Sequence, residues 1–193
     1  MIVGEAPAEE DDRTGLAFTG KAGKHLNRLL QAARVPTDNY YATNVIKCHP
    51  DKGRFPDGNE AEICRKYLVK QVQLVQPKAV IITGVQALKY LLLWETHEEP
   101  EPLHGWINRT FRRRDLYGEI MFLVCYHPSY LMKTEIDEDE EGWVQSVAAL
   151  WAYCQHKIAG TAPAPLAFEE LRSVPQIKRM GRNLFGTDRG RVL

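Results

Sequence analysis

Short apolar runs alternate with amphipathic stretches along the chain, and this pattern predicts strands that alternate with helices. Met1–Val3 and Ala79–Thr83 are continuous apolar runs, as expected for strands that helices cover on both faces. The run 40–45 is rich in β-forming residues and predicts a second strand. A hairpin that turns near Tyr117 is expected to return along 120–126 as the fourth strand.

Later segments carry apolar side chains at the spacing of one helical face. They cover residues 23–33, 59–75, 86–93 and 143–158. Helices that follow strands in this way predict a three-layer α/β/α fold, with a four-stranded parallel sheet flanked by helices. We expect residues 1–158 to form one domain. The tail 159–193 contains Pro and Gly without strong periodicity, so we expect a C-terminal extension that is ordered only in part.

Three of the predicted strands are followed directly by polar side chains that a core does not need. Glu5 follows the first strand, Asn44 lies near the end of the second, and His127 follows the fourth. The carboxyl ends of parallel strands meet at one crevice, where open α/β sheets bind ligands. Each residue alone also suits an ordinary turn or loop, and Phe18, in the first polar loop, also suits a core plug. Their joint occurrence favours a binding site.

Residues 15–21 match the GxxxxGK pattern of a phosphate-binding loop. Ala22 then occupies the place of the Ser or Thr that would bind Mg²⁺, and residues 11–14 are polar where a buried strand should precede the loop. Both features argue against nucleotide hydrolysis, and we expect no nucleotide cofactor.

Net charge does not separate the possible partners, because 25 Lys and Arg residues balance 25 Asp and Glu residues. Local basic groups nearest the crevice along the chain are expected in Arg112–Arg114 and at Lys21, Lys24 and Lys133. No apolar run has the length of a membrane span, and the start lacks the zones of a signal peptide. We therefore expect a cytoplasmic monomer without a membrane partner.

Three motifs, in their order and spacing, resemble a known family. They read GEAPAEEDDRTGLAFTGKAG at 4–23, TNVIKCHP at 43–50 and HPSYL at 127–131. Over roughly residues 2–158 they are similar to the iron–sulfur type, or family 4, uracil-DNA glycosylases of bacteria and archaea. The resemblance implies a DNA-repair enzyme that flips uracil out of single- or double-stranded DNA and hydrolyses its N-glycosidic bond.

The resemblance also implies roles for individual residues. Phe18 would stack on the flipped base, and Asn44 would read its edge, because an amide offers an acceptor beside donors that match uracil O4 and N3–H. His127 and Glu5 would stabilise the uracil anion and the cationic sugar. The remaining expected contacts are Asp11 as a second catalytic carboxylate, Ala6 and Ala8 beside the base, and Ser129 and Leu131 at the DNA, with the Leu131 region as a wedge.

Two departures from the family pattern affect these expectations. The first motif closes with Ala8 where the family usually has Gly. Cys48 and Cys64 correspond to two of the four ligands of a [4Fe–4S] cluster, while the other two belong to a CxxC before the first strand. The given sequence starts inside that strand, so either this segment is missing or the cluster is lost. The alternative function is a degenerate or truncated glycosylase fold that binds DNA or uracil without excision.

The other two cysteines have a different expected place. Cys125 and Cys154 fall on a predicted strand and a predicted helix, so we expect them in the core. No short CxxC pairing occurs in the chain, and in a reducing compartment cysteines serve as thiols or metal ligands rather than disulfides.

Overall fold

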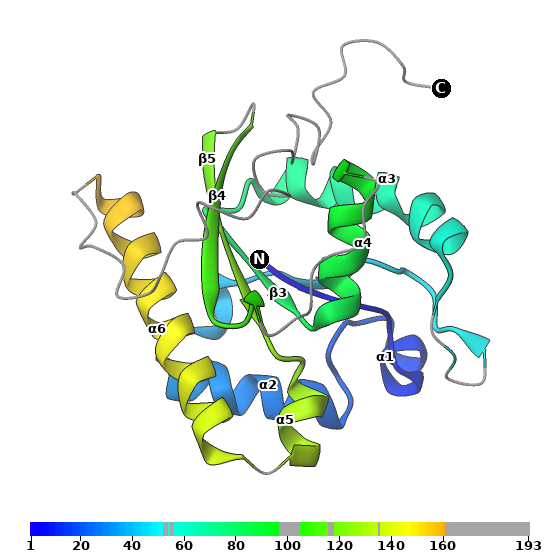
Figure 1. Ribbon diagram of the computed structural model, residues 1–193, viewed down its shortest axis with the longest axis horizontal. Coiled ribbons are helices and arrows are strands. Elements are labelled where there is room, and N and C mark those ends of the chain that lie inside the picture. Colours follow the sequence, from blue (N-terminus) through cyan, green and yellow to red (C-terminus); the bar gives the residue numbers. More distant parts are fainter. Residues whose placement is uncertain (52–53, 55, 97–104, 116–117, 135, 161–193) are drawn as a thin grey trace.

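The structure is a computed structural model, and it describes most of the predicted domain (Figure 1). The described residues are 1–51, 54, 56–96, 105–115, 118–134 and 136–160. The expected C-terminal extension lies almost entirely outside them, so its boundary stays a prediction.

A five-stranded sheet forms the centre of the fold, in the order β2-β1-β3-β5-β4. The strands are β1 (Ile2–Gly4), β2 (Ala42–Asn44), β3 (Ala79–Thr83), β4 (Arg109–Asp115) and β5 (Gly118–Cys125). β1 pairs in parallel with β2 and β3, and β3 pairs in parallel with β5. These four strands are the predicted parallel sheet.

The prediction of only four strands is wrong, because the first arm of the hairpin joins the sheet as a fifth strand. β4 runs antiparallel to β5, from the pair Arg109 and Val124 to the pair Asp115 and Gly118. The two arms are adjacent in the chain, so the hairpin adds β4 to the edge without a crossover helix. The sheet is therefore mixed.

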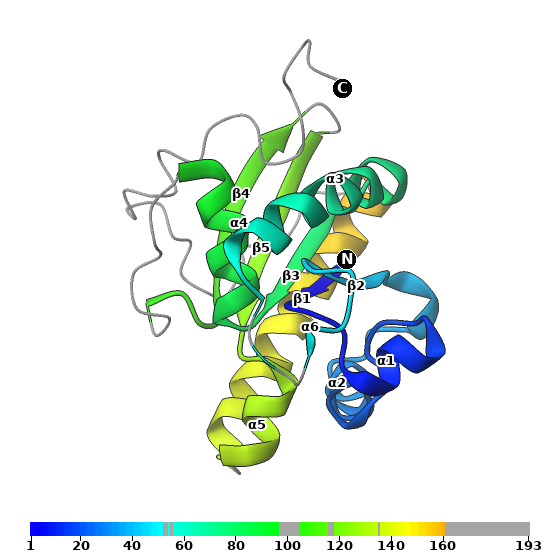
Figure 2. The ribbon, with the colours of Figure 1, turned by 90° about the vertical axis from the view of Figure 1, so that its right-hand side faces the viewer.

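Helices cover both faces of this sheet, as Figure 2 shows. They are α1 (Glu9–Thr14), α2 (Lys21–Ala32), α3 (Gly58–Val75), α4 (Val85–Thr96), α5 (Pro128–Thr134) and α6 (Asp137–Ala159), with a short 3₁₀ helix at Thr37–Asn39. Buried side chains of α3 and α4 belong to the core on one face, and those of α2 and α6 to the core on the other.

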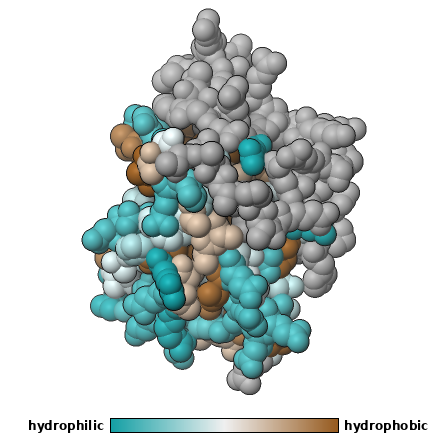
Figure 3. Space-filling model, turned by 90° about the vertical axis from the view of Figure 1, so that its left-hand side faces the viewer, coloured by the Kyte–Doolittle hydropathy of each residue, from teal (hydrophilic) through white to brown (hydrophobic). Residues whose placement is uncertain are grey.

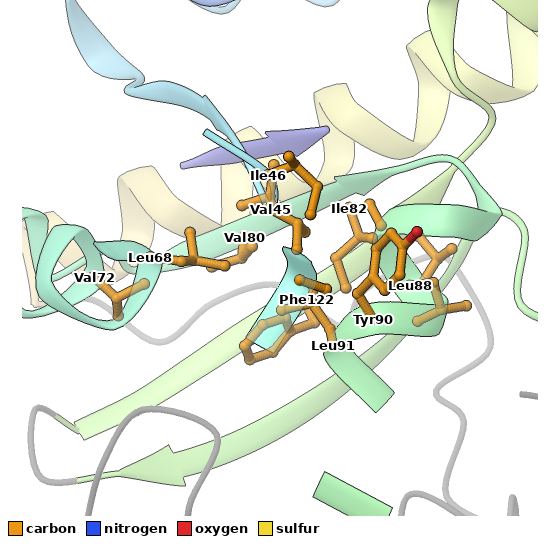
Figure 4. Packing of buried hydrophobic residues seen from close by; sticks show 14 of the residues in the cluster. Val45, Ile46, Leu68, Val72, Val80, Ile82, Leu88, Tyr90, Leu91 and Phe122 are labelled. Carbon is orange, nitrogen blue, oxygen red and sulfur yellow. The ribbon is translucent and has the colours of Figure 1, made fainter. Parts of the chain in front are cut away.

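Strand residues alternate between the two cores, as the pleat requires. Val80, Ile82 and Phe122 pack with Leu68 of α3 and Leu88 of α4 (Figure 4). Their neighbours in sequence point the other way; they are Ala79, Ile81, Met121, Leu123 and Cys125, which pack with α2 and α6. The continuous apolar runs of the sequence are thus explained by burial on both faces.

The apolar pattern of the sequence did not predict α1, α5 or the first turns of α6. α1 begins with four acidic residues, as does α6 at Asp137, and such side chains favour the positive end of a helix dipole. α5 begins at Pro128, a residue that suits the first helical position. Apolar periodicity carries no signal for such turns.

On the side of α6, the described residues form a mainly hydrophilic surface, with small hydrophobic areas between polar groups (Figure 3). Within the described part of the chain, no helix is both long and apolar enough to cross a membrane.

Candidate functional site

The polar strand exits converge at the carboxyl edge of the sheet, as predicted. Glu5 follows β1, Asn44 ends neighbouring β2, and His127 follows β5, which lies beyond β3. Backbone hydrogen bonds continue the pairing of β1 and β2 past their ends, from Val45 N to Gly4 O at 2.8 Å and from Ile46 N to Glu5 O at 2.9 Å. The first two motifs are therefore held against each other by the backbone.

Gly4 leaves the space in which Asn44 and Phe18 meet. A Cβ atom on Gly4 would lie 2.5 Å from Asn44 Oδ1 and 2.7 Å from Phe18 Cζ. Asn44 is 5% exposed, and no described residue forms a hydrogen bond with its side-chain amide. Asn44 also lines a pocket at this edge of the sheet. The amide is thus placed to bind a ligand beside an aromatic ring.

The backbone of Phe18 is held in a left-handed conformation, with φ at 61°. Non-glycine residues adopt this region rarely, and such strain is common at binding sites. A Cβ on Gly23 would lie 1.7 Å from the Phe18 carbonyl oxygen, so the loop closes on the first turn of α2 only because Gly23 has no side chain. The Phe18 ring stacks on the His127 ring, with centroids 6.3 Å apart and an interplanar angle of 29°.

The imidazole of His127 is fixed by the start of α5. Its Nδ1 lies 3.2 Å from Ser129 N and 2.7 Å from Ser129 Oγ. Because a backbone N–H can only donate, Nδ1 must accept, and the proton of the neutral ring is on Nε2. Burial lowers the pKa of His127 to about 4. His127 is therefore a neutral donor whose Nε2–H has no described partner.

A pocket of about 510 Å³ lies beside these groups. Its lining residues are Glu5, Ala6, Thr83, Gly84, Val85, Gln86, Tyr126, His127, Ser129 and Tyr130. Burial raises the pKa of Glu5, whose carboxylate has no described hydrogen-bond partner. The sequence did not indicate Thr83 or Gln86, although the change from an apolar run to Thr83-Gly84 marks another strand exit at this edge.

Asn44 lines a second, smaller pocket of about 290 Å³, together with Asp11 and Lys47. Phe18 links the two pockets. Its ring stacks on His127, which lines the first pocket, and lies close to Asn44, which lines the second. A third cavity of about 410 Å³ is lined by Met1, Ala79 and other residues at the opposite end of the sheet. None of the expected catalytic residues reaches that cavity.

The carboxylate of Asp11 faces its own loop. It accepts hydrogen bonds from Thr19 N at 2.6 Å, Thr19 Oγ1 at 2.8 Å, Ala8 N at 3.1 Å and Gly20 N at 3.3 Å. Burial acts to raise the pKa of Asp11, but these bonds outweigh it and hold the pKa below its ordinary value. The expected second catalytic carboxylate is thus occupied in fixing the residue next to Phe18, away from the pocket that Glu5 lines.

Lys47 donates hydrogen bonds that hold the end of β2, including the backbone of Asn44, in place. The sequence did not indicate this role. Its Nζ donates to Gln71 Oε1 at 2.7 Å, to Thr43 Oγ1 at 3.0 Å and to the Asn44 carbonyl. Burial lowers the pKa of Lys47 to about 8. His49, also in the second motif, donates from Nδ1 to Pro7 O at 2.9 Å. This hydrogen bond joins the second motif to the first.

The remaining expected contact residues divide into two groups. Ala6 and Ser129 line the pocket. Ala8 is exposed and lines neither pocket. Its φ is −85°, a backbone conformation that any residue can adopt, so the position does not require glycine. Leu131 is 1% exposed and packs in the core beneath α5, so its side chain does not face a DNA ligand here. Tyr130, beside it, is exposed.

The expected basic cluster Arg112–Arg114 is not near the pocket. Strand register pairs Arg112 with Met121 and Arg114 with Glu119, toward the amino end of β5. The strand is antiparallel, so later residues of β4 lie farther from the carboxyl edge. The side chains of Arg113 and Arg114 are outside the described part. Lys21 and Lys24, both exposed, start the helix that follows Phe18 and are the nearer basic residues.

The described residues do not fit a [4Fe–4S] cluster. Cys48 is exposed, and buried Cys64 accepts the backbone N–H of Lys47 at 3.4 Å. Cys64 belongs to the core on the α3 side of the sheet, whereas Cys125 and Cys154 belong to the core on the α2 side. Among the side chains whose positions are described, no group of three or more His, Cys, Asp or Glu could hold a metal ion.

Comparison with known proteins bears on what this pocket binds. A type-4 uracil-DNA glycosylase of Archaeoglobus fulgidus is 36% identical over 152 residues, which are 78% of this chain and 75% of the relative. One of Thermotoga maritima is 30% identical over 142 residues, 72% of this chain and 68% of the relative. A type-5 uracil-DNA glycosylase of Pyrobaculum aerophilum is 32% identical over 148 residues, 68% of this chain and 61% of the relative.

A family model for the uracil DNA glycosylase superfamily matches residues 1–150. This match runs from β1 into α6 and contains all three motifs, whose residues line the two neighbouring pockets. The chain belongs to the uracil DNA glycosylase superfamily.

Proposed function

We propose that this chain excises uracil from DNA by flipping the base into the crevice and hydrolysing its N-glycosidic bond. The observation that carries the proposal is the Asn44 amide, which lines a pocket, has no hydrogen-bond partner among the described residues and lies beside the Phe18 ring. Flipping a base costs a few kcal/mol, and stacking on an aromatic ring returns about 1–3 kcal/mol. The amide then distinguishes uracil from cytosine, because cytosine carries an amino group where uracil has O4.

Bond cleavage separates a uracil anion from a cationic sugar, so stabilisation of these charges is the main task. The Nε2–H of His127 would donate to uracil O2 as negative charge develops there. A donor that is already fixed needs no reorganisation during the reaction, and such a donor contributes about 10²–10³ in rate. Ser129 keeps this donor in place.

Glu5 would act on the sugar side of the same bond. Its carboxylate lines the pocket that His127 lines, and its backbone carbonyl is bonded to Ile46 N. An ionised carboxylate there stabilises the cationic sugar and orients the attacking water. Asp11 would contribute only by holding the loop that carries Phe18.

Uracil release from oligonucleotides tests the proposal. Single- and double-stranded substrates with one uracil are incubated with excess protein, and the resulting abasic sites are cleaved with alkali. We expect cleavage at uracil and none at cytosine. Binding of the oligonucleotide without release would instead identify the alternative, a degenerate glycosylase fold that holds DNA.

A further inference from the structure

Two tyrosines form a stacked pair at the edge of the pocket. The ring centroids of Tyr126 and Tyr130 are 4.5 Å apart, with an interplanar angle of 22°. Tyr126 directly follows β5, and Tyr130 lies in the first turn of α5 with 39% of its surface exposed. His127 lies between them in sequence. The pair is therefore built on the same turn that fixes the imidazole.

The pair and the candidate catalytic groups line one continuous pocket. Tyr126 and Tyr130 share it with Glu5 and His127, and its volume is about 510 Å³. Cavities in this range hold drug-sized ligands, which are larger than one pyrimidine. A bound uracil would leave part of the pocket, on the tyrosine side, for another planar group.

We propose that Tyr126 and Tyr130 form a stacking platform for the base next to uracil in the same DNA strand, an inference that rests on the proposed function. An aromatic ring accepts any base, because every base has a π-face. Tyr126 supports one face of the Tyr130 ring, so little side-chain freedom is lost when a base covers the exposed face.

The platform is tested by binding measurements that remove either the ring or the base. Fluorescence anisotropy is measured, within a time too short for uracil release, on single-stranded oligonucleotides with one uracil and on matched strands in which the 5′ or 3′ neighbour carries no base. For the unaltered protein, loss of the stacked neighbour should weaken binding roughly 5- to 150-fold. Tyr130→Ala should show this loss with the complete strand and no further loss with the strand that lacks the base.

Two variants control the experiment. Tyr130→Phe keeps the ring and should bind like the unaltered protein. Tyr67→Ala removes a tyrosine that is 51% exposed on α3, and it should leave all affinities unchanged. Equal weakening of Tyr130→Ala on complete and base-lacking strands would overturn the platform. Uracil release is measured in parallel, so an inactive protein would refute the proposed function, while the affinities still decide the stacking contact.

Discussion

Nδ1 of His127 lies 3.2 Å from the backbone nitrogen of Ser129, and this contact fixes the proton of the neutral ring on Nε2. Pro128, between them, starts α5 without needing a hydrogen bond of its own. The HPS sequence is thus a helix start in which a histidine side chain accepts the first free N–H. One short segment therefore both begins α5 and presents a donor to the pocket.

The first prediction concerns the pH dependence of folding. The pKa of His127 is lowered from 6.5 to about 4 by burial. Between these values the unfolded chain binds a proton that the folded chain does not, so the free energy of unfolding falls as pH falls. We expect His127 to contribute a decrease of about 2 kcal/mol between about pH 7.5 and about pH 5.

Urea denaturation at both pH values measures this decrease. His127→Asn lacks the titrating group, so its free energy of unfolding should fall by about 2 kcal/mol less over the same interval. Identical decreases in the two proteins would show that His127 titrates normally in the folded state.

The second prediction concerns recognition of the base. Asn44→Asp replaces the amide with a carboxylate, which has no donor for uracil O4 but can accept from the amino group of cytosine. We expect uracil excision to fall by about 10² or more, since a hydrogen-bonding site rejects a mismatched base strongly. Any remaining activity should favour cytosine. Undiminished uracil release by the variant would make Asn44 an ordinary turn residue.

The third prediction concerns the space at Gly4. In Gly4→Ala the new methyl group would lie 2.5 Å from Asn44 Oδ1 and 2.7 Å from Phe18 Cζ, so both side chains must move. A displacement of about 1 Å can lower a rate about 10²-fold. Gly58→Ala is the matched control, because a Cβ there meets no atom within 4 Å. Single-turnover rates should fall in the first variant only, and equal rates would place uracil elsewhere.

The fourth prediction concerns iron. A [4Fe–4S] cluster takes four thiolates, and Cys125 and Cys154 lie on the opposite side of the sheet from Cys64. We expect the purified chain to contain far less than one cluster. Iron analysis and visible absorption check this. About four irons per chain would show that Cys125, Cys154 or His49 reaches Cys48 and Cys64 after all.

Sequence patterns predicted the parts of the fold whose signal is local. Apolar runs identified β1 and β3. The polar residues at the ends of β1, β2 and β5 correctly indicated that Glu5, Asn44 and His127 share one edge. The extra strand β4 was missed as a sheet member because its arm contains Arg112–Arg114 and no continuous apolar run. The same antiparallel register carries these arginines away from the pocket, although they are near it along the chain.

Side-chain direction was the least predictable feature. α5 has seven residues, too few for periodicity to show that Leu131 faces the core while Tyr130 faces outward. The directions of the Asp11 and Lys47 side chains were likewise not predictable. A carboxylate or an ammonium has the same sequence signal whether it faces a pocket or fixes a loop. The hydrogen bonds of Asp11 depend on how its loop brings Thr19 back to it, and those of Lys47 depend on Gln71, 24 residues away on α3.

The most direct test of the account is single-turnover uracil release by His127→Ala beside the unaltered protein and Ser129→Ala. The first variant loses the fixed Nε2–H donor, so its rate should fall by about 10² or more. Ser129→Ala keeps the backbone N–H that fixes the ring, so its rate should fall much less. Cleavage at uracil by the unaltered protein, with this order of rates, is the predicted result. Equal rates in the unaltered protein and His127→Ala would contradict the account.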